Sequence, residues 1–176
     1  MSCFWEEKEI TKLVKTMTEN QKMSVVYLKT PLGWLKVTAD DVGVTSIRFL
    51  EKKPSSVVSP KGTSFAHAAS QELKKYFKGE RISFKTPLHL KGTAFQKKVW
   101  NTLRKISYGK TVSYSEIAKK IDCPKGARAV GMANHVNPIP IFVPCHRVIG
   151  QSGKLTGYAG GLEKKAWLLS LEQSLN

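Results

Sequence analysis

The first half of the chain carries short runs of alternating apolar and polar residues. Val, Thr, Ile, Tyr and Trp are frequent in these runs, which is typical of β-strands. Pro, Gly and Asp separate the runs, which is typical of tight turns. The pattern predicts an antiparallel meander of three strands, at residues 24–30, 34–40 and 44–50, and favours one more short strand at 81–85.

Helical spacing of apolar residues occurs on both sides of this meander. Near the N-terminus, residues 6–19 place their apolar positions on one face, which predicts a helical extension within residues 1–23. After the meander, residues 65–79 are amphipathic and end at Gly79, a suitable residue to follow the last helical turn. The strands and this helix predict a small α/β domain over residues 24–90.

The second half of the chain is mainly helical in pattern, and the change falls at residues 87–92. Residues 92–106 place apolar side chains on one helical face. A short strand or extended segment near Cys145 is the main exception to the helical pattern. The sequence therefore predicts an α+β fold, in which a mainly helical C-terminal domain with a helix-turn-helix occupies residues 91–176.

Two short helices make up the helix-turn-helix. Ser113 and Glu116 have the spacing of a capping box, which predicts the start of the first helix. The second helix, at residues 126–135, is rich in small residues and carries Arg128 among them. Small residues let a helix approach closely, and both a neighbouring helix and a nucleic-acid groove fit this composition.

The chain closes with two irregular segments and a helix. Residues 137–144 contain three prolines and are not expected to be helical. A Gly-rich loop follows at 150–161, and a final helix is predicted at 162–173. Its apolar face is expected to hold Leu162, Ala166 and Leu169.

Charge changes the picture, because the chain is strongly basic. Lys and Arg number 29 against 13 Asp and Glu, which gives a net charge of +16. Residues 91–154 alone hold 12 of the basic residues and only two acidic ones. Such an excess favours a polyanionic partner, since bound phosphates release counterions. A basic protein without such a partner is the alternative, which the concentration of charge in the second half disfavours.

Several classes of protein are excluded by composition. No apolar run approaches the roughly 18 residues that a membrane-spanning helix needs, and the N-terminus lacks a secretory signal. Cys3, Cys123 and Cys145 are too few for a disulfide framework or a four-ligand zinc site. We expect an intracellular protein, in the nucleus of a eukaryote or the cytoplasm of a prokaryote, with no cofactor and no metal.

Cys145 and His146 follow the proline segment and are the candidate reactive groups. A free thiol has a pKa of about 8.5, so it needs a base or a positive field to act as a nucleophile. Neighbouring side chains in an extended segment point to opposite faces, so a water molecule would relay the proton to the imidazole. Glu172 would orient the other imidazole nitrogen. Taken alone, Cys145 could equally be a structural cysteine, which packs in the core like a small apolar side chain.

Four stretches read together carry a specific resemblance. They are N-P-I-P-I-F-V-P-C-H-R-V from Asn137, G-Y-A-G-G-L-E-K-K-A-W-L-L-S-L-E from Gly157, F-Q-K-K-V-W-N-T-L-R-K-I from Phe95 and A-R-A-V-G-M-A from Ala127. This pattern resembles the methylated-DNA–protein-cysteine methyltransferases, or O6-alkylguanine-DNA alkyltransferases. The resemblance covers residues 92–176 almost without gaps and the preceding half loosely.

The resemblance implies a role for each catalytic residue. Cys145 would attack the alkyl carbon on guanine O6, and His146 would take the thiol proton through a water. Glu172 would hydrogen-bond the imidazole, Asn137 would tie the cysteine turn into this network, and Tyr114 would donate its hydroxyl to the leaving guanine.

The resemblance also implies the residues that contact substrate and DNA. The guanine pocket would be formed by Pro140, Val148, Tyr158 and Ala159. The DNA would be contacted by Tyr114, Ser115, Ala127, Arg128, Ala129, Gly131 and Gln151. Arg128 would fill the space that a flipped nucleotide leaves. Ala159 replaces the serine of some members, which removes a hydroxyl contact, and Ser107 replaces a proline in a turn.

The implied function is DNA repair by single-turnover transfer of an alkyl group from O6-alkylguanine, and from O4-alkylthymine as a further substrate, to Cys145. The partner would be duplex DNA with alkylated bases. The protein would bind it as a monomer, and no membrane would be involved. A non-enzymatic binder of alkylated DNA is the alternative, but such proteins have another residue at the cysteine. A transcription regulator would need an additional cysteine-rich domain, and a cysteine hydrolase would need an oxyanion hole.

Overall fold

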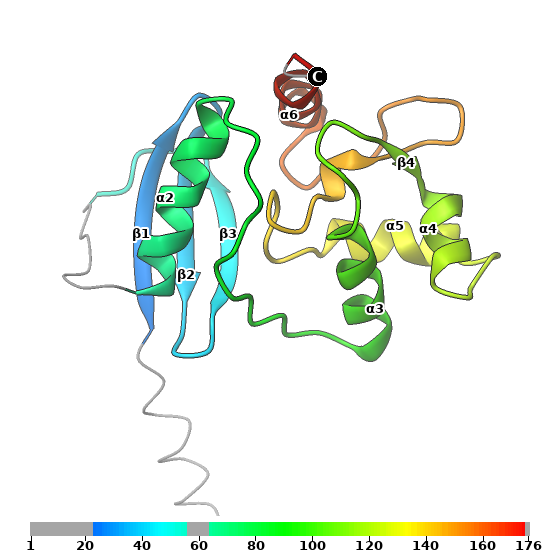
Figure 1. Ribbon diagram of the computed structural model, residues 1–176, viewed down its shortest axis with the longest axis horizontal. Helices are drawn as coiled ribbons and strands as arrows, with labels where there is room; N and C mark the ends of the chain where they lie inside the picture. The colour runs from blue at the N-terminus through cyan, green and yellow to red at the C-terminus, as the bar shows by residue number, and fades with distance from the viewer. Residues whose placement is uncertain (1–22, 56–63, 175–176) are drawn as a thin grey trace, which may run out of the picture.

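A computed structural model describes residues 23–55 and 64–174, which form two packed halves (Figure 1). The N-terminal helix expected within residues 1–23 lies outside the described residues, except for Met23. In the described ranges, no helix is both long and apolar enough to cross a bilayer.

The N-terminal half is a three-stranded antiparallel sheet with one helix on its face. The strands are β1 (Ser24–Thr30), β2 (Gly33–Ala39) and β3 (Val44–Leu50), in the order β1-β2-β3, as the alternating pattern predicted. Helix α2 (Phe65–Phe77) crosses the sheet in Figure 1 and contacts all three strands. The apolar residues buried between them are Val26, Leu28, Leu35, Val37, Ala66, Ala69 and Leu73.

The short strand expected at residues 81–85 does not form. The backbone N–H groups of Lys85 and Thr86 donate to the carboxylate of Glu72 on α2, at 2.8 and 3.3 Å. Pairing with β3 occurs later in the chain, where Val44 forms an isolated parallel bridge with Leu88. The Glu72 side chain therefore binds the backbone donor of Lys85, the last residue of the expected strand, in place of a neighbouring strand.

The C-terminal half is built on three short helices, α3 (Ala94–Leu103), α4 (Tyr114–Lys120) and α5 (Ala127–His135). The capping box of Ser113 and Glu116 is confirmed at the start of α4. Helix α5 packs against both others, and the Trp100 indole on α3 donates to a carbonyl of α5 at 2.8 Å. The remaining short strands, β4 (Val112–Ser113) and β5 (Val148–Ile149), pair in parallel.

Helix α6 (Leu162–Gln173) forms as predicted, but it buries a different face. Leu162 and Ala166 are exposed, whereas Lys165, Leu168, Leu169 and Glu172 are buried. The prediction was right for Leu169 and wrong for Leu162 and Ala166, because it counted only apolar residues. The two charged members of the buried face are both hydrogen-bonded inside the protein.

Contacts between the two halves position the site. Ile47 on β3 donates its backbone N–H to the carbonyl of Pro138 at 2.9 Å. Phe84 stacks on Phe142, with ring centroids 4.1 Å apart. The hydroxyl of Tyr76 on α2 reaches Glu172 on α6 at 2.8 Å. These contacts hold the loop at residues 137–144 and helix α6 against the N-terminal half.

Candidate active site

Cys145 begins a single 3₁₀ turn, η1 (Cys145–Arg147), directly after Pro144. The extended geometry expected for Cys145 and His146 is therefore wrong, although a short strand near the cysteine does form, as β5. The backbone N–H of Arg147 donates to the carbonyl of Pro144 at 3.0 Å, which closes the turn. Because the segment turns, Cys145 and His146 do not alternate across a strand. The thiol side chain is buried, with 6% of the residue exposed.

Asn137 holds the cysteine turn from the preceding loop. Its Nδ2 donates to Cys145 Sγ at 3.1 Å and to the carbonyl of Val143 at 2.8 Å. Its Oδ1 accepts from the backbone of Ile139 at 3.0 Å. Ile141 in the same loop has φ of 76°, a strained value for a β-branched residue. Such strain persists only where surrounding contacts fix the backbone, which is often the case at functional sites.

Cys145 lies in the wall of a cavity of about 450 Å³ between the two halves. The predicted substrate residues Pro140, Tyr158 and Ala159 line this cavity, whereas Val148 does not and is fully buried. Residues 45–49 of β3 form the opposite wall, which the sequence of the N-terminal half did not suggest. The volume lies within the range of small-molecule sites.

His146 and Glu172 form a fully buried pair behind the thiol. His146 Nε2 lies 2.8 Å from Glu172 Oε1, and neither side chain has any exposed surface. A carboxylate only accepts hydrogen bonds, so Nε2 carries the proton. The lone pair of a neutral imidazole is then on Nδ1, which has no partner among the described residues.

Glu172 receives further donors that sequence reasoning missed. Arg147 contacts both carboxylate oxygens, through Nε at 2.8 Å and Nη2 at 2.9 Å. Tyr76 Oη donates at 2.8 Å and the backbone of Gly109 at 3.0 Å. Burial raises the pKa of Glu172, but the bonds from His146 and Arg147 outweigh it, and the pKa lies well below its usual range. The carboxylate is therefore ionised at neutral pH.

The thiol and the imidazole are both neutral at rest. Burial raises the pKa of the Cys145 thiol, against the opposing effects of the Asn137 hydrogen bond and the Lys165 charge. Burial lowers the pKa of His146, although Glu172 acts in the other direction. A neutral imidazole beside a neutral thiol is the state in which a base is ready to accept a proton.

Lys165 is a second buried charge near the thiol. Its Nζ donates to the carbonyls of Val148 and Thr156, both at 2.6 Å, and the side chain has no exposed surface. Burial lowers the pKa of Lys165 to about 8. Its position seven residues before Glu172, on one face of α6, was the available sequence signal.

The remaining predicted side chains lie around the Gly-rich loop and on α5. Tyr114 Oη donates to the carbonyl of Thr156 at 3.2 Å and does not line the 450 Å³ cavity. Tyr158 Oη is buried without a partner among the described residues. Arg128, Ala129 and Gln151 are exposed, whereas Ser115, Ala127 and Gly131 are half-buried.

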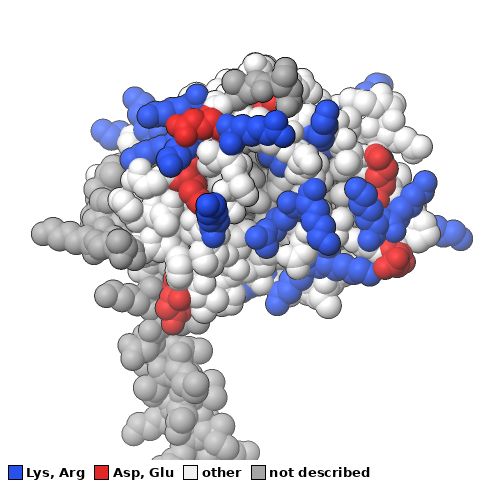
Figure 2. Space-filling model, in the orientation of Figure 1, with Lys and Arg blue, Asp and Glu red and all other residues white. Residues whose placement is uncertain are grey.

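Basic side chains dominate the surface around these helices. In Figure 2, Lys and Arg outnumber Asp and Glu over the half that contains α3, α4 and α5. Helix α5 also exposes Met132, at 64%, next to its small residues. This surface has the positive charge that favours a polyanionic partner.

Comparison with known families gives matches over both halves. Residues 94–174 match the model of the 6-O-methylguanine DNA methyltransferase DNA binding domain. Residues 23–90 match the ribonuclease-like domain of the same methyltransferases.

Individual relatives agree with the family models. The methylated-DNA–protein-cysteine methyltransferase of Methanosarcina acetivorans is 48% identical over 157 residues, covering 86% of this chain and 99% of that protein. The constitutive enzyme of Bacillus subtilis is 45% identical over 82% of this chain and 92% of its own length.

A solved structure shares the fold at similar identity. It is Mycobacterium tuberculosis OGT in complex with DNA, with a TM-score of 0.77 and 46% identity, covering 86% of this chain and 93% of that one. With both halves matched and relatives nearly half identical along almost their entire length, this chain belongs to the methylated-DNA–protein-cysteine methyltransferases, transferases of DNA repair.

Proposed function

We propose that this protein transfers an alkyl group from O6 of guanine in DNA irreversibly to its own Cys145. The sulfur would form a bond to the alkyl carbon while the bond from that carbon to O6 breaks, in one displacement. The observation that carries the proposal is the buried Cys145 thiol in the wall of a base-sized cavity, with the His146–Glu172 pair behind it. O4-alkylthymine is a further substrate of the same chemistry.

The proton of the thiol would leave through His146. Nδ1 is the imidazole atom with a free lone pair, and a water between it and Sγ would relay the proton. The imidazolium that forms would be stabilised by Glu172, which is already ionised. Arg147 and Tyr76 hold that carboxylate in place, so no reorganisation is required when charge develops.

The thiolate would form only during the reaction. Its negative charge would be stabilised by the Asn137 amide at 3.1 Å from the sulfur and by the buried ammonium of Lys165. The product is a thioether, which has no easy leaving group. Each molecule would therefore react once, and the chemistry requires no cofactor and no metal.

The guanine would occupy the 450 Å³ cavity, with Pro140, Tyr158 and Ala159 around it. Val148 is fully buried and does not line this cavity, so only its backbone groups would contact the guanine, at the exocyclic amine. Tyr114 would donate its hydroxyl to the departing base. That hydroxyl now donates to the Thr156 carbonyl, so this role requires the Gly-rich loop to release it.

Helices α4 and α5 would form the helix-turn-helix that docks on duplex DNA. The small residues Ala127, Ala129 and Gly131 would let α5 approach the minor groove, with Ser115 and Gln151 contacting the strands. A buried O6 atom cannot be reached inside a duplex, so the base would be flipped out at a cost of a few kcal/mol. Exposed Arg128 would fill the vacated space.

The proposal extends to the domains, the oligomeric state, the partner and the location of the protein. Residues 24–90 and 91–176 would be the two domains, and a single copy would act on DNA. The relative from Mycobacterium tuberculosis that was solved with DNA supports this partner. The relatives from Bacillus subtilis and Methanosarcina acetivorans, which have no nucleus, support a location in the cytoplasm.

Intact-protein mass spectrometry after incubation with a duplex that contains one O6-methylguanine tests the proposal. We expect a mass gain of one methyl group, saturating at one per protein and mapping to the Cys145 peptide. Cys145→Ser should abolish the gain, and Cys123→Ser, which removes the other described free thiol, should leave it unchanged.

Two other outcomes would overturn this proposal. Tight binding to the modified duplex without a mass gain would favour the non-enzymatic binder of alkylated DNA. Neither binding nor a mass gain would mean that the site serves a different substrate.

A further inference from the structure

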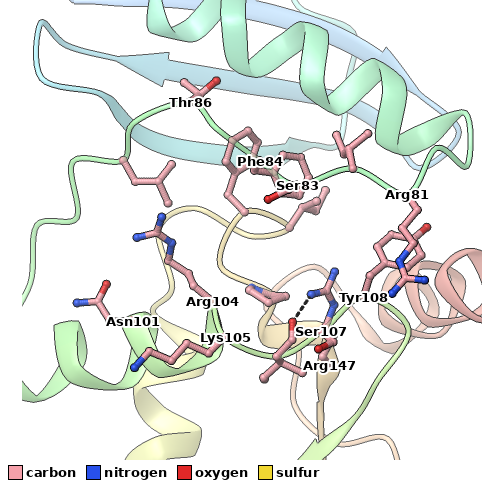
Figure 3. A pocket seen from close by; sticks show the side chains of 16 residues that line it. Arg81, Ser83, Phe84, Thr86, Asn101, Arg104, Lys105, Ser107, Tyr108 and Arg147 are labelled. Carbon is pink, nitrogen blue, oxygen red and sulfur yellow. Dashed lines mark hydrogen bonds between the residues drawn. The ribbon is translucent and has the colours of Figure 1, made fainter.

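A second, larger cavity of about 810 Å³ lies between the two halves, on the other side of the active-site loop (Figure 3). It is lined by residues 81–88 after α2, by Asn101 on α3 with residues 104–108, and by the active-site loop, which is the loop at residues 137–144 described above. It shares no lining residue with the Cys145 cavity. Pro140 and Cys145 face one cavity, whereas Ile141, Phe142 and Pro144 face the other.

The lining of this second cavity is cationic. Arg81, Arg104, Lys105 and Arg147 contribute to it, and no Asp or Glu is among its lining residues in the described ranges. Arg147 is neutralised by Glu172. None of the ion pairs among the described residues includes Arg81, Arg104 or Lys105, so these three cations have no acidic partner in that part of the chain.

Two of these cations lie at opposite ends of the cavity, which suits an elongated anionic ligand. In Figure 3, Arg104 lies at one end of the cavity, and Arg81 lies beside Tyr108 at the other. The ring of Tyr108 and the guanidinium of Arg147 are 5.6 Å apart. Lys105 points away from the centre, so its charge contributes at the margin.

The rest of the lining is aromatic and hydrogen-bonding. Phe84 lies between the two cationic ends in Figure 3 and is stacked on Phe142, whereas Tyr108 lies at the end beside Arg81. Ser83, Thr86, Asn101 and Ser107 add polar groups. Aromatic surfaces with flanking Arg and Lys are the combination by which proteins hold nucleotide bases and phosphates without sequence preference.

We propose that this cavity is a separate nucleotide-binding site, which takes a phosphate and its attached base through Arg81, Arg104 and the aromatic side chains. The ligand chemistry is a nucleotide unit, supplied by a single-stranded nucleic acid or by a free nucleotide. The site does not use Cys145 or helix α5. It therefore stands independently of the alkyl-transfer reaction.

Binding of two fluorescent probes tests the site and separates the two sources. The probes are fluorescein-labelled dT12 and mant-dATP, titrated with the wild type, the variant R81A/R104A and the matched control K52A/K53A. The control removes the same charge from two exposed residues outside the cavity. We expect the first variant to weaken binding about tenfold and the control less than twofold. The salt slope for dT12 should fall by roughly 0.7 for each phosphate that the variant no longer neutralises.

The two probes give outcomes that either support or overturn the proposal. Weakening of both probes or of mant-dATP alone supports a site for free nucleotides, and weakening of dT12 alone supports a site for a strand. If R81A/R104A matches the control for both probes, the proposal is overturned. Urea unfolding of all three proteins verifies the fold. Benzyl transfer from free O6-benzylguanine, measured in parallel, reports on the proposed alkyl transfer. Because probe binding and benzyl transfer are separate measurements, one proposal can fail without the other.

Discussion

At the scale of the residue, Glu172 links the reactive groups to the rest of the molecule. Its carboxylate is fully buried and accepts hydrogen bonds from His146, Arg147, Tyr76 and the backbone of Gly109. Removing one partner of a buried charged pair leaves the other without compensation, which costs more than the pair itself contributed. The charge of Glu172 therefore matters for stability as well as for the imidazole.

Glu172→Gln should slow alkyl transfer and leave DNA affinity nearly unchanged. The amide cannot stabilise an imidazolium, and it leaves the Arg147 charge buried, at a cost of about 3–5 kcal/mol in unfolding free energy. Mass spectrometry of benzyl transfer, urea unfolding and DNA anisotropy measure the three effects. Glu163→Gln, at an exposed position of the same helix, is the control. A large loss of DNA affinity would instead make Glu172 a support of the DNA surface.

The stability that Glu172 provides should be lost in acid. Its folded pKa lies below the ordinary value of about 4.3, so the unfolded chain takes up the proton first as the pH falls. The contribution is complete above that value and declines below it. The difference in unfolding free energy between the wild type and Glu172→Gln should therefore shrink from pH 6 to pH 3. A difference that stays constant over this range would contradict the assignment.

At the scale of the element, α5 and α2 contribute in different ways. Helix α5 exposes Arg128 and Ala129 on one face and buries Val130 and Ala133 on the other. Helix α2 belongs to the opposite half, yet its Tyr76 reaches the carboxylate on α6. Helix α5 would offer its exposed face to DNA under the proposed function, and helix α2 joins the halves at the site.

Arg128→Ala should weaken repair of duplex DNA more than reaction with free O6-benzylguanine. The free base needs no flipping, so an arginine that fills the vacated space has no role in that reaction. Rates on the two substrates, compared by mass spectrometry, give the ratio. Lys29→Ala on β1 removes the same charge and should change neither rate by more than twofold. Equal losses on both substrates would exclude the proposed role of Arg128.

Tyr76→Phe should loosen the contact between the two halves. The change removes one hydrogen bond to a buried carboxylate, which is expected to lower the unfolding free energy by about 1–3 kcal/mol. The rate of benzyl transfer should also fall, because Glu172 loses a donor that holds it in place. Urea unfolding and the transfer rate measure both effects, with Tyr27→Phe on β1 as the matched control. An unchanged unfolding free energy and an unchanged transfer rate would show that this hydrogen bond contributes to neither stability nor reaction.

At the scale of the whole molecule, charge governs the approach to DNA. The net charge is +16, and Figure 2 places many of the basic side chains over the half that holds α3, α4 and α5. Neutralised phosphates release counterions, so affinity for a duplex depends on salt. Under the proposed function, the Cys145 cavity itself would take an uncharged base.

Duplex affinity should therefore fall steeply with salt, whereas reaction with free O6-benzylguanine should change little. A slope of roughly −0.9 in log affinity against log salt is expected for each phosphate contact. Anisotropy titrations with a duplex from 50 to 200 mM salt measure the slope, and benzyl transfer in the same buffers is the reference. A flat response for the duplex would argue against a charged docking surface.

The sequence alone determined the features that depend on nearby residues. The alternating runs specified the meander, and Ser113 with Glu116 specified the start of α4, because strand alternation and capping involve residues only two or three positions apart. The motif around Cys145 identified the family for the same reason, since its residues are read in order along the chain.

The tertiary structure decided which polar groups are buried and with whom. Tyr76 on α2 donates to Glu172 on α6, which is 96 positions away in the sequence. The side chain of Lys165 on α6 turns inward and donates to two backbone carbonyls, whereas charged side chains of that helix were expected to face solvent. The segment at 81–85 forms no strand, and the backbone donor of Lys85 at its end binds the Glu72 carboxylate instead. In each case the free energy depends on a partner distant in sequence, because a buried charge or donor is tolerated only where another group satisfies it.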